Sequence, residues 1–284
     1  MKFAVVTPVL NGRDYLRATA ASVAAQRNGG ARTVTHHIRE STRSSAPSED
    51  IAAEFSCEYA RAPDTGLYDA IAQGLDAACA AGADILAWLN ADEQYLPGAF
   101  DAAEKTFAEN PDLDLIFGDY LIARLNPGSA PAPAAARREI PPRKFYLRHG
   151  VNYILSCATF FTRETWLKHG PFDLSYKLLA DKKFYFNALD SGAAFRHVPA
   201  WLGCYGATGQ NASLSPAAPA ERARLRAEIG AFRSPLLRKS VRAMRVAEKI
   251  LRGCHRKTRI TTTLYAADGA AREVSGVYPG KWVD

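Results

Sequence analysis

Short apolar runs alternate with amphipathic stretches along residues 1–120. The runs have the length and apolar content of buried strands, whereas the stretches between them repeat apolar side chains at helical spacing. We expect strands at Lys2–Val9, Thr33–Glu40, Glu58–Ala62, Asp84–Leu89 and Leu113–Leu121. We expect helices at Gly12–Gln26, Ser48–Ser56, Leu67–Ala81 and Pro97–Glu109. This alternation predicts an α/β fold in which a mostly parallel sheet carries helices on both faces.

The pattern changes after residue 125. Residues 126–138 are rich in Pro and Ala and predict a mobile loop, and residues 200–220 predict further loops. Between them we expect strands at Ile154–Thr162 and Phe195–Val198 and helices at Arg163–His169 and Leu178–Leu189. Near the end of the chain, Arg259–Leu264 and Val274–Val277 predict a hairpin.

Polar and acidic side chains follow the first four expected strands. Right-handed crossovers bring the carboxyl ends of parallel strands to one edge, where ligands bind in open α/β sheets. The four strand ends are 7–11, Glu40–Thr42, Pro63–Gly66 and Asn90–Glu93. Carboxylates at such an edge can hold a divalent cation together with a substrate's phosphates. A polar turn without a ligand is the alternative interpretation of Asn90–Glu93.

The sequence contains no glycine-rich phosphate loop of either common type. A diphosphate bound at the predicted edge would therefore lack a cradle of backbone N–H groups. Its charge would need a metal ion, which makes Asp92 the candidate ligand.

Composition indicates a globular protein in a reducing compartment. The apolar share is 48%, and no window approaches the roughly 20 apolar residues of a membrane span. Met1–Val6 is too short and strand-like for a signal peptide, so we expect a cytoplasmic protein. The five cysteines are scattered without C-x-x-C spacing, and the six histidines show no metal-ligand spacing.

The basic character of the chain is concentrated near its end. Residues 233–259 contain ten Lys and Arg against one acid, more than the whole net charge of +7. Apolar residues recur there at helical spacing, which predicts a basic amphipathic helix suited to an anionic membrane surface. The alternative is a helix packed on the rest of the protein with its basic face in water. No aromatic residues are interleaved with the cations, so we expect no nucleic-acid partner.

The order of motifs resembles the family 2 glycosyltransferases, nucleotide-sugar enzymes with the Rossmann-like GT-A fold. The matching segments are Val6–Asn11, Pro63–Ala70, Trp88–Glu93, Phe117–Asp119, Ala158–Phe161 and Phe172–Asp181. The resemblance covers residues 1–210, with 1–120 as the nucleotide-sugar part and 140–210 as the acceptor and catalytic-base part. Residues 211–284 would form a C-terminal extension that contains the basic helix.

The resemblance implies a role for particular residues. The residues implied to bind the nucleotide-sugar are Thr7, Pro8, Asn11, Glu40, Asp64, Tyr68, Asn90 and Ala91. Asp92 would hold Mg²⁺ or Mn²⁺, which neutralises the departing nucleoside diphosphate. Asp181 would be the catalytic base that takes the proton of the acceptor hydroxyl. A helix N-cap is the alternative for Asp181.

The sequence departs from the family pattern at three places. Glu40-Ser41-Thr42 stands where an aspartate followed by glycine and serine is usual, which puts uracil recognition in doubt. Asn90 offers a neutral oxygen at the first position of the D-x-D element. Lys182 and Lys183 follow Asp181 and could depress its pKa, bind an anionic acceptor or simply be solvated.

The resemblance implies an inverting transfer of a sugar, with a UDP-sugar as the expected donor. A glycan or lipid-linked acceptor in cell-surface polysaccharide biosynthesis is expected, which would place the protein peripherally on the inner face of the membrane. The alternatives are a catalytically silent nucleotide-sugar-binding relative and a metal-dependent nucleotidyltransferase.

Overall fold

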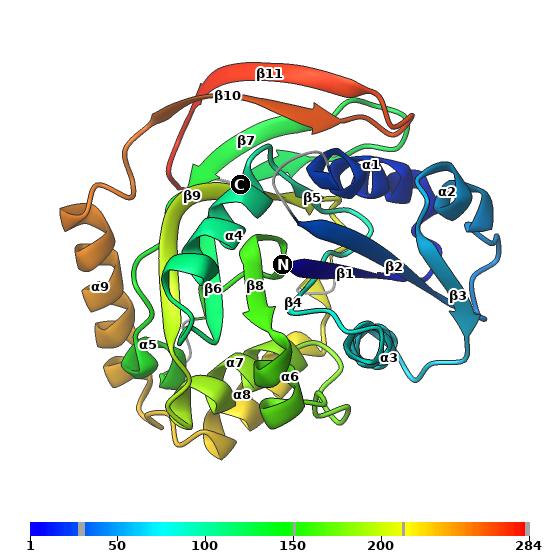
Figure 1. Ribbon diagram of the computed structural model, residues 1–284. Coiled ribbons are helices and arrows are strands. Elements are labelled where there is room, and N and C mark those ends of the chain that lie inside the picture. The colour runs from blue at the N-terminus through cyan, green and yellow to red at the C-terminus, as the bar shows by residue number, and fades with distance from the viewer. Residues whose placement is uncertain (28–31, 150–151, 212–213, 282–284) are drawn as a thin grey trace.

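A computed structural model describes residues 1–27, 32–149, 152–211 and 214–281 of the chain. The strands are β1 (Lys2–Val9), β2 (Thr33–Ser41), β3 (Glu58–Ala62), β4 (Ile85–Trp88), β5 (Gln94–Tyr95), β6 (Leu115–Arg124), β7 (Ala132–Arg137), β8 (Thr159–Thr162), β9 (Phe195–Ala207), β10 (Thr258–Tyr265) and β11 (Ala271–Tyr278). The helices are α1 (Arg13–Ala24), α2 (Glu49–Glu54), α3 (Leu67–Ala80), α4 (Ala99–Glu109), α5 (Lys144–Arg148), α6 (Arg163–His169), α7 (Ala180–Asp190), α8 (Ala218–Glu228) and α9 (Pro235–Leu251). Figure 1 shows these elements arranged around one central sheet.

The central sheet has nine strands and is mixed. Its order is β3-β2-β1-β4-β8-β6-β9-β5, with β7 paired to β6. The pairs among β3, β2, β1 and β4 are all parallel, so the predicted edge of carboxyl strand ends forms as expected. Strand β8 lies antiparallel between β4 and β6, and β6 therefore keeps the direction of β4. The α/β fold with a mostly parallel sheet is confirmed, and β8 is the inserted antiparallel strand.

Both faces of the sheet are buried. Phe3 and Val5 belong to one apolar cluster and Ala4 and Val6 to another, because successive side chains of a strand point to opposite faces. Helices α3, α6 and α7 lie below the strands in Figure 1, and α1 lies above them. Strands covered on both faces carry near-continuous apolar runs, which is the pattern in the sequence.

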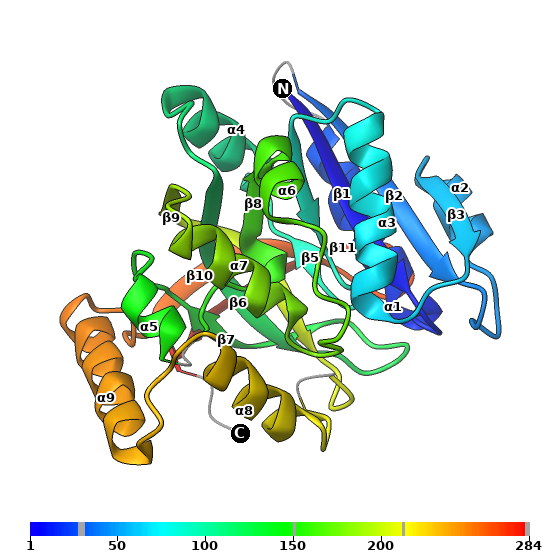
Figure 2. The ribbon, with the colours of Figure 1, turned by 90° about the horizontal axis from the view of Figure 1, so that it is seen from below.

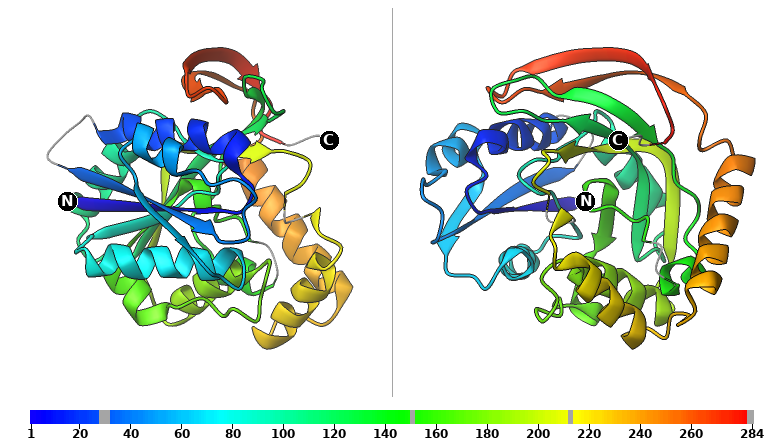
Figure 3. Two further views of the ribbon diagram at one scale, coloured as in Figure 1. Left: turned by 90° about the vertical axis from the view of Figure 1, so that its right-hand side faces the viewer. Right: turned by 180° about the vertical axis from the view of Figure 1, so that it is seen from behind.

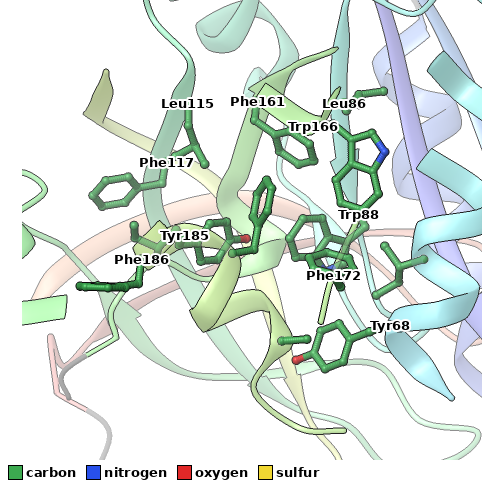
Figure 4. Packing of buried hydrophobic residues seen from close by; sticks show 14 of the residues in the cluster. Tyr68, Leu86, Trp88, Leu115, Phe117, Phe161, Trp166, Phe172, Tyr185 and Phe186 are labelled. Atoms are coloured by element: carbon green, nitrogen blue, oxygen red, sulfur yellow. The ribbon is translucent and has the colours of Figure 1, made fainter. Parts of the chain in front are cut away.

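The face covered by α3, α6 and α7 is rich in aromatic side chains. Trp88 of β4 stacks on Tyr185 of α7 with ring centroids 5.9 Å apart, and it meets the edge of Phe172 at 5.5 Å. Figure 4 shows Tyr68 of α3 at the border of this cluster, where its ring contacts Phe172. The cluster fixes α3 and α7 relative to β4.

Three local expectations were wrong. Within the predicted loop 126–138, Ala132–Arg137 form β7, which pairs with β6. The predicted loops at 200–220 instead contain the end of β9 and the start of α8. The strand expected at Ile154–Thr162 begins only at Thr159, after a 3₁₀ turn. These strands depend on hydrogen-bond partners elsewhere in the sheet, which local composition does not reveal.

The predicted hairpin near the end of the chain is confirmed by β10 and β11. Figure 3 shows it curving over β7 at the top of the molecule. It is attached to the central sheet by reciprocal hydrogen bonds between Gln94 and Tyr265. The amide of Gln94 donates to the Tyr265 carbonyl, and the Tyr265 N–H donates to Gln94 Oε1, both at 2.8 Å.

Helix α9 is fastened to the sheet domain by buried ion pairs. The Glu139 carboxylate is 1% exposed and lies 2.7 Å from Arg245 and 3.0 Å from Lys249, one turn apart on α9. Arg137 lies 3.7 Å from the same carboxylate, so Glu139 is the shared counter-charge of three cations, and removing one partner of a buried ion pair is strongly destabilising. Within the described residues, none of the helices is long and apolar enough to cross a membrane.

Removing the Glu139 carboxylate should therefore weaken the fold strongly. We expect Glu139→Ala to lower the free energy of unfolding by about 3–5 kcal/mol, because Arg245 and Lys249 remain buried without a counter-charge. Urea unfolding monitored by circular dichroism measures the change. Glu164→Ala is the control, since its ion pair with Arg163 is exposed and should contribute less than about 1 kcal/mol. Equal effects of the two substitutions would contradict the prediction.

Candidate active site

A cavity of about 710 Å³ opens at the carboxyl ends of the parallel strands. Its wall comes from β1, the turn after β4, α3, α7 and α8, so it joins segments that are far apart in the sequence. The predicted site residues in this wall are Pro8, Asn11, Asp64, Tyr68, Asn90, Ala91, Asp92 and Asp181. The structure therefore brings together the residues predicted to bind a metal, a nucleotide-sugar and a proton.

The side chains of Thr7 and Glu40 are occupied elsewhere. The Thr7 hydroxyl lies 2.8 Å from Nε2 of His36, whose pKa burial lowers to about 3. The Glu40 carboxylate accepts hydrogen bonds from the Ser48 N–H at 2.8 Å and the Tyr59 hydroxyl at 2.7 Å. Both side chains are buried in these contacts and hold the strand ends together, and neither lies in the cavity wall.

Asn11 turns the chain sharply at the end of β1. Its φ is 54°, in the left-handed region that asparagine tolerates better than most residues. Its Oδ1 accepts a hydrogen bond from the Ser45 N–H at 2.9 Å, and its own N–H donates to Ser44 Oγ at 3.2 Å. Asn11 thus ties the loop after β2 to the end of β1.

Asp64 offers a free acceptor beside the cavity. Arg43 Nη2 and the Gly66 N–H both donate to its Oδ1, at 2.5 and 2.9 Å. Its Oδ2 is buried and has no hydrogen-bond partner among the described residues. A buried carboxylate oxygen without a partner is costly, so a ligand that donates to it would stabilise the site. Arg43 was not predicted as a site residue, and it lines the same cavity.

Glu93 shapes the turn that follows β4. The Asn90 N–H donates to Glu93 Oε2 at 3.0 Å, the Glu93 N–H donates to the Asn90 carbonyl at 3.0 Å, and Ser156 Oγ donates to Oε2 at 3.3 Å. Burial, with Asp92 beside it, raises the pKa of Glu93 to about 8. Its carboxyl is thus held inside the turn, which presents Asn90 and Asp92 to the cavity.

Asp92 lies in a polar corner closed by the end of β9. Asn211 Nδ2 donates to Asp92 Oδ2 at 3.2 Å and to the Gly206 carbonyl at 2.8 Å. A Cβ at position 206 would lie 2.0 Å from the Asp92 carbonyl oxygen, so only glycine allows this approach. Asn211 was missed at the level of the sequence, because nothing local marked it within the predicted loops.

The oxygen atoms at this turn fit a hard divalent cation. Burial raises the pKa of Asp92 to about 6, because its charge is partly removed from water. Asn90 Oδ1 is buried and has no hydrogen-bond partner among the described residues. The part of the chain that the structure describes has no group of three or more His, Cys, Asp or Glu able to hold a metal. Mg²⁺ or Mn²⁺ here would take further oxygens from a diphosphate and water.

Asp181 is held in place by Tyr68. It lies in the first turn of α7, and the Tyr68 hydroxyl donates to its Oδ1 at 2.7 Å. Burial raises the pKa of Asp181, while Lys182 and the Tyr68 hydrogen bond act in the opposite direction. The pKa of Tyr68 is raised well above its usual value, so the hydroxyl remains a donor. The Asp181 carboxyl is thus desolvated and fixed in direction.

The two lysines after Asp181 have different surroundings. Lys182 lines the cavity. Lys183 forms ion pairs with Asp173 at 2.6 Å and with Glu228 of α8. Arg222 of α8 also lines the cavity, although α8 was not predicted and lies outside the part that carries the resemblance. The C-terminal segment therefore supplies part of the wall.

The chain matches a known family over more than half of its length. The family described as Glycosyl transferase family 2 matches residues 4–164, a segment that includes the Asn90–Glu93 turn and ends before Asp181. No protein with a curated function matches the sequence.

Solved structures show the same fold at low sequence identity. Residues 1–349 of TarS from S. aureus, in complex with UDP, are 14% identical with a TM-score of 0.59, over 88% of this chain and 72% of that one. Glucosyl-3-phosphoglycerate synthase from Mycobacterium tuberculosis with UDP is 16% identical with a TM-score of 0.55, over 82% of both chains. The same enzyme with Mn²⁺, UDP and glucosyl-3-phosphoglycerate gives a TM-score of 0.54, over 99% of this chain and 88% of that one, at 16% identity.

The GT-A fold and the matched segment agree with the geometry at the ends of β1 and β4. The chain belongs to glycosyl transferase family 2 and is a glycosyltransferase that takes a sugar from a nucleotide-sugar.

Proposed function

We propose that this protein transfers a hexosyl group from a UDP-sugar to a glycan or lipid-linked acceptor, with inversion at the anomeric carbon. The observation that carries the proposal is that Asp92 and Asp181, from distant segments, line one cavity. Cell-surface polysaccharide biosynthesis at the cytoplasmic side of the membrane is the setting we infer for this reaction. The proposal extends the family assignment to a donor, an acceptor class and a stereochemical course.

The nucleoside is proposed to lie against β1 and the loop after β3. Pro8 and Asn11 line this part of the cavity, and the unpartnered Oδ2 of Asp64 can accept a hydrogen bond from a base or ribose. Structural neighbours support uridine as the base, since TarS was solved with UDP and with UDP-GlcNAc. Glu40 is not needed as an acceptor in this arrangement, because the unpartnered Oδ2 of Asp64 supplies an oxygen there.

Asn90 and Asp92 are proposed to hold the divalent cation at the diphosphate. A bound Mg²⁺ or Mn²⁺ would neutralise the charge that develops on the departing nucleoside diphosphate. The chain itself fixes the backbone of the turn, through the hydrogen bond from the Asn90 N–H to Glu93, and the direction of the Asp92 carboxylate, through Asn211. The Mn²⁺ complex of glucosyl-3-phosphoglycerate synthase supports this choice of metal.

Asp181 is proposed to act as the base. Its carboxylate takes the proton from the acceptor hydroxyl while that oxygen attacks the anomeric carbon from the side opposite the diphosphate. Tyr68 is a positioning residue, because its hydroxyl orients the carboxylate without meeting the acceptor in this scheme. Lys182 and Arg222 add positive charge to the cavity wall and would favour an anionic acceptor group or the diphosphate.

Replacing the base should stop transfer and preserve donor binding. We expect Asp181→Asn to lower the turnover number by about 10²–10⁴-fold, the usual contribution of a general base. Release of the nucleoside diphosphate measures turnover, and calorimetry with UDP-sugars and Mn²⁺ measures binding. Full function of this variant in cells would favour the catalytically silent relative. Release of pyrophosphate from a nucleoside triphosphate would favour a nucleotidyltransferase.

Replacing Asp92 should remove the dependence of donor binding on metal. We expect Asp92→Ala to lower donor affinity at least about tenfold in Mn²⁺ and to leave the weaker metal-free binding unchanged, because the variant lacks the charged ligand. Thermal stabilisation by UDP-sugars with and without metal measures this difference. Asp112→Ala, at an exposed site outside the cavity wall, is the matched control. If Asp92→Ala showed the same metal-dependent stabilisation as the unmodified protein, the assignment of Asp92 as the metal ligand would be contradicted.

The rate should depend on the ionisation of Asp181. Its pKa is raised by burial, so the acidic limb of kcat/KM is expected at a higher pH than an ordinary aspartate would give. Tyr68→Phe should move that limb to still higher pH, because the hydroxyl stabilises the carboxylate and lowers its pKa. A pH profile of kcat/KM for both proteins is the measurement. A limb that moves to lower pH in the variant would contradict the scheme.

A further inference from the structure

Helix α9 exposes its large apolar side chains. Ser234 caps its first turn and Pro235 opens it, both common at helix starts. Leu236 is 72% exposed and Leu251 is 87% exposed, near the two ends of the helix. The exposed large apolar residues of α9 are Leu236, Leu237, Met244, Val246, Ile250 and Leu251.

These side chains form one stripe along the helix. Leu237, Met244 and Leu251 recur every seven residues, and Leu236 and Ile250 lie on the neighbouring row. Positions spaced this way share a face of an α-helix. In a globular protein such a stripe normally faces the core. We define the stripe by the exposed apolar residues named above, without Val246, which lies to one side of it.

Charged side chains form the opposite face and attach α9 to the protein. Arg245 and Lys249 pair with Glu139, as described above. Glu248 accepts hydrogen bonds from Arg143 Nη2 at 2.6 Å and from the Tyr146 hydroxyl at 2.9 Å. The alternative expectation of a helix packed on the rest of the protein with its basic face in water accounts for these contacts, but it does not account for the apolar stripe, which also faces water.

Exposed cations flank the stripe. Lys239 and Arg242 lie along one edge of it within α9, Arg233 precedes the helix, and Arg256 and Lys257 follow it, whereas Arg252 at the end of the helix is paired with Glu248. Glu248 is the single acid in the sequence of α9, and it is turned toward Arg143 and the protein. An apolar stripe with cations along one edge and beyond both ends of the helix matches the chemistry of an anionic lipid surface, with acyl chains below and acidic headgroups beside them.

We propose that α9 docks the protein on an anionic bilayer surface, with the helix in the plane of the headgroups and its apolar stripe at the acyl boundary. A second copy of the chain fits less well, because two such faces would bring the like charges of Lys239, Arg242 and the cations at the helix ends together. This docking does not depend on the proposed reaction, so either proposal can fail without the other.

The position of α9 relative to the cavity agrees with this role. Figure 2 shows α8 and α9 at the end of the molecule opposite the N-terminus, which is the end toward which β1 runs. Helix α8 directly precedes α9 and carries Ala218 and Arg222 of the cavity wall. Docking through α9 would thus hold the cavity close to the lipid surface, where a lipid-linked acceptor would be located.

Vesicle sedimentation with the full chain tests the proposal. We expect binding to phosphatidylcholine vesicles that contain phosphatidylglycerol, little binding to pure phosphatidylcholine, and weakening by salt. The double variant Leu236→Asp/Leu251→Asp should lower the partition coefficient at least about tenfold, since both side chains would leave the apolar layer. Lys239→Ala should lower it about fivefold, the equivalent of about 1 kcal/mol for one cation.

Leu167→Asp is the matched control, because Leu167 lies on α6 and is 65% exposed. It should leave vesicle binding unchanged, and circular dichroism should show all the variants folded, since each change is at a solvent-exposed position. Absence of binding to anionic vesicles at low salt would overturn the proposal, as would an equal loss in Leu167→Asp. A concentration-dependent dimer that Leu236→Asp/Leu251→Asp abolishes, without vesicle binding, would assign the stripe to a second copy instead.

Discussion

The hydrogen bond from Tyr68 to Asp181 connects the two parts of this protein at the point where the reaction is proposed to occur. Tyr68 belongs to α3, which packs on the parallel strands, and Asp181 belongs to α7, which covers the same face of the sheet. The rings of Trp88, Phe172 and Tyr185 fill the space between the two helices. Because this cluster is aromatic and fully packed, a shift of α7 against β4 would disturb several ring contacts at once. The distance between the Asn90–Glu93 turn and Asp181 is thus set by the core.

The sequence was a good guide to the first four strands and to their polar ends. Apolar runs bounded by polar residues are a local property, so Asn90–Glu93 and Pro63–Gly66 could be placed at one edge without a structure. Strand β7 and helix α8 could not be foreseen in this way, because both are formed by contacts with distant segments. Asn211 is the sharpest case, since it becomes part of the site only when β9 brings it to Asp92.

The resemblance to the family predicted which chain positions lie at the site, but it did not predict where every side chain points. Pro8 lines the cavity, but the hydroxyl of its neighbour Thr7 turns to His36, because adjacent residues of a strand point to opposite faces. The Glu40 side chain also points away from the cavity, because its carboxylate accepts hydrogen bonds from Ser48 and Tyr59. Burial also raises the pKa of Asp92 and Glu93, which the sequence shows only as acidic residues. Glu93 is held inside the turn by the Asn90 N–H and Ser156, and Asp92 beside it is the residue proposed to meet the cation.

The hairpin of β10 and β11 has a consequence for the order in which the site is completed during synthesis. Gln94 directly follows the Asn90–Glu93 turn, and its side chain finds its hydrogen-bond partners only at Tyr265. The ribosome makes residue 94 long before residue 265, so the nascent chain can form the parallel strands while this support is still missing. The Asn90–Glu93 turn reaches its final surroundings only when residue 265 has left the ribosome. A shortened product that ends before β10 would carry every predicted site residue and yet lack this support.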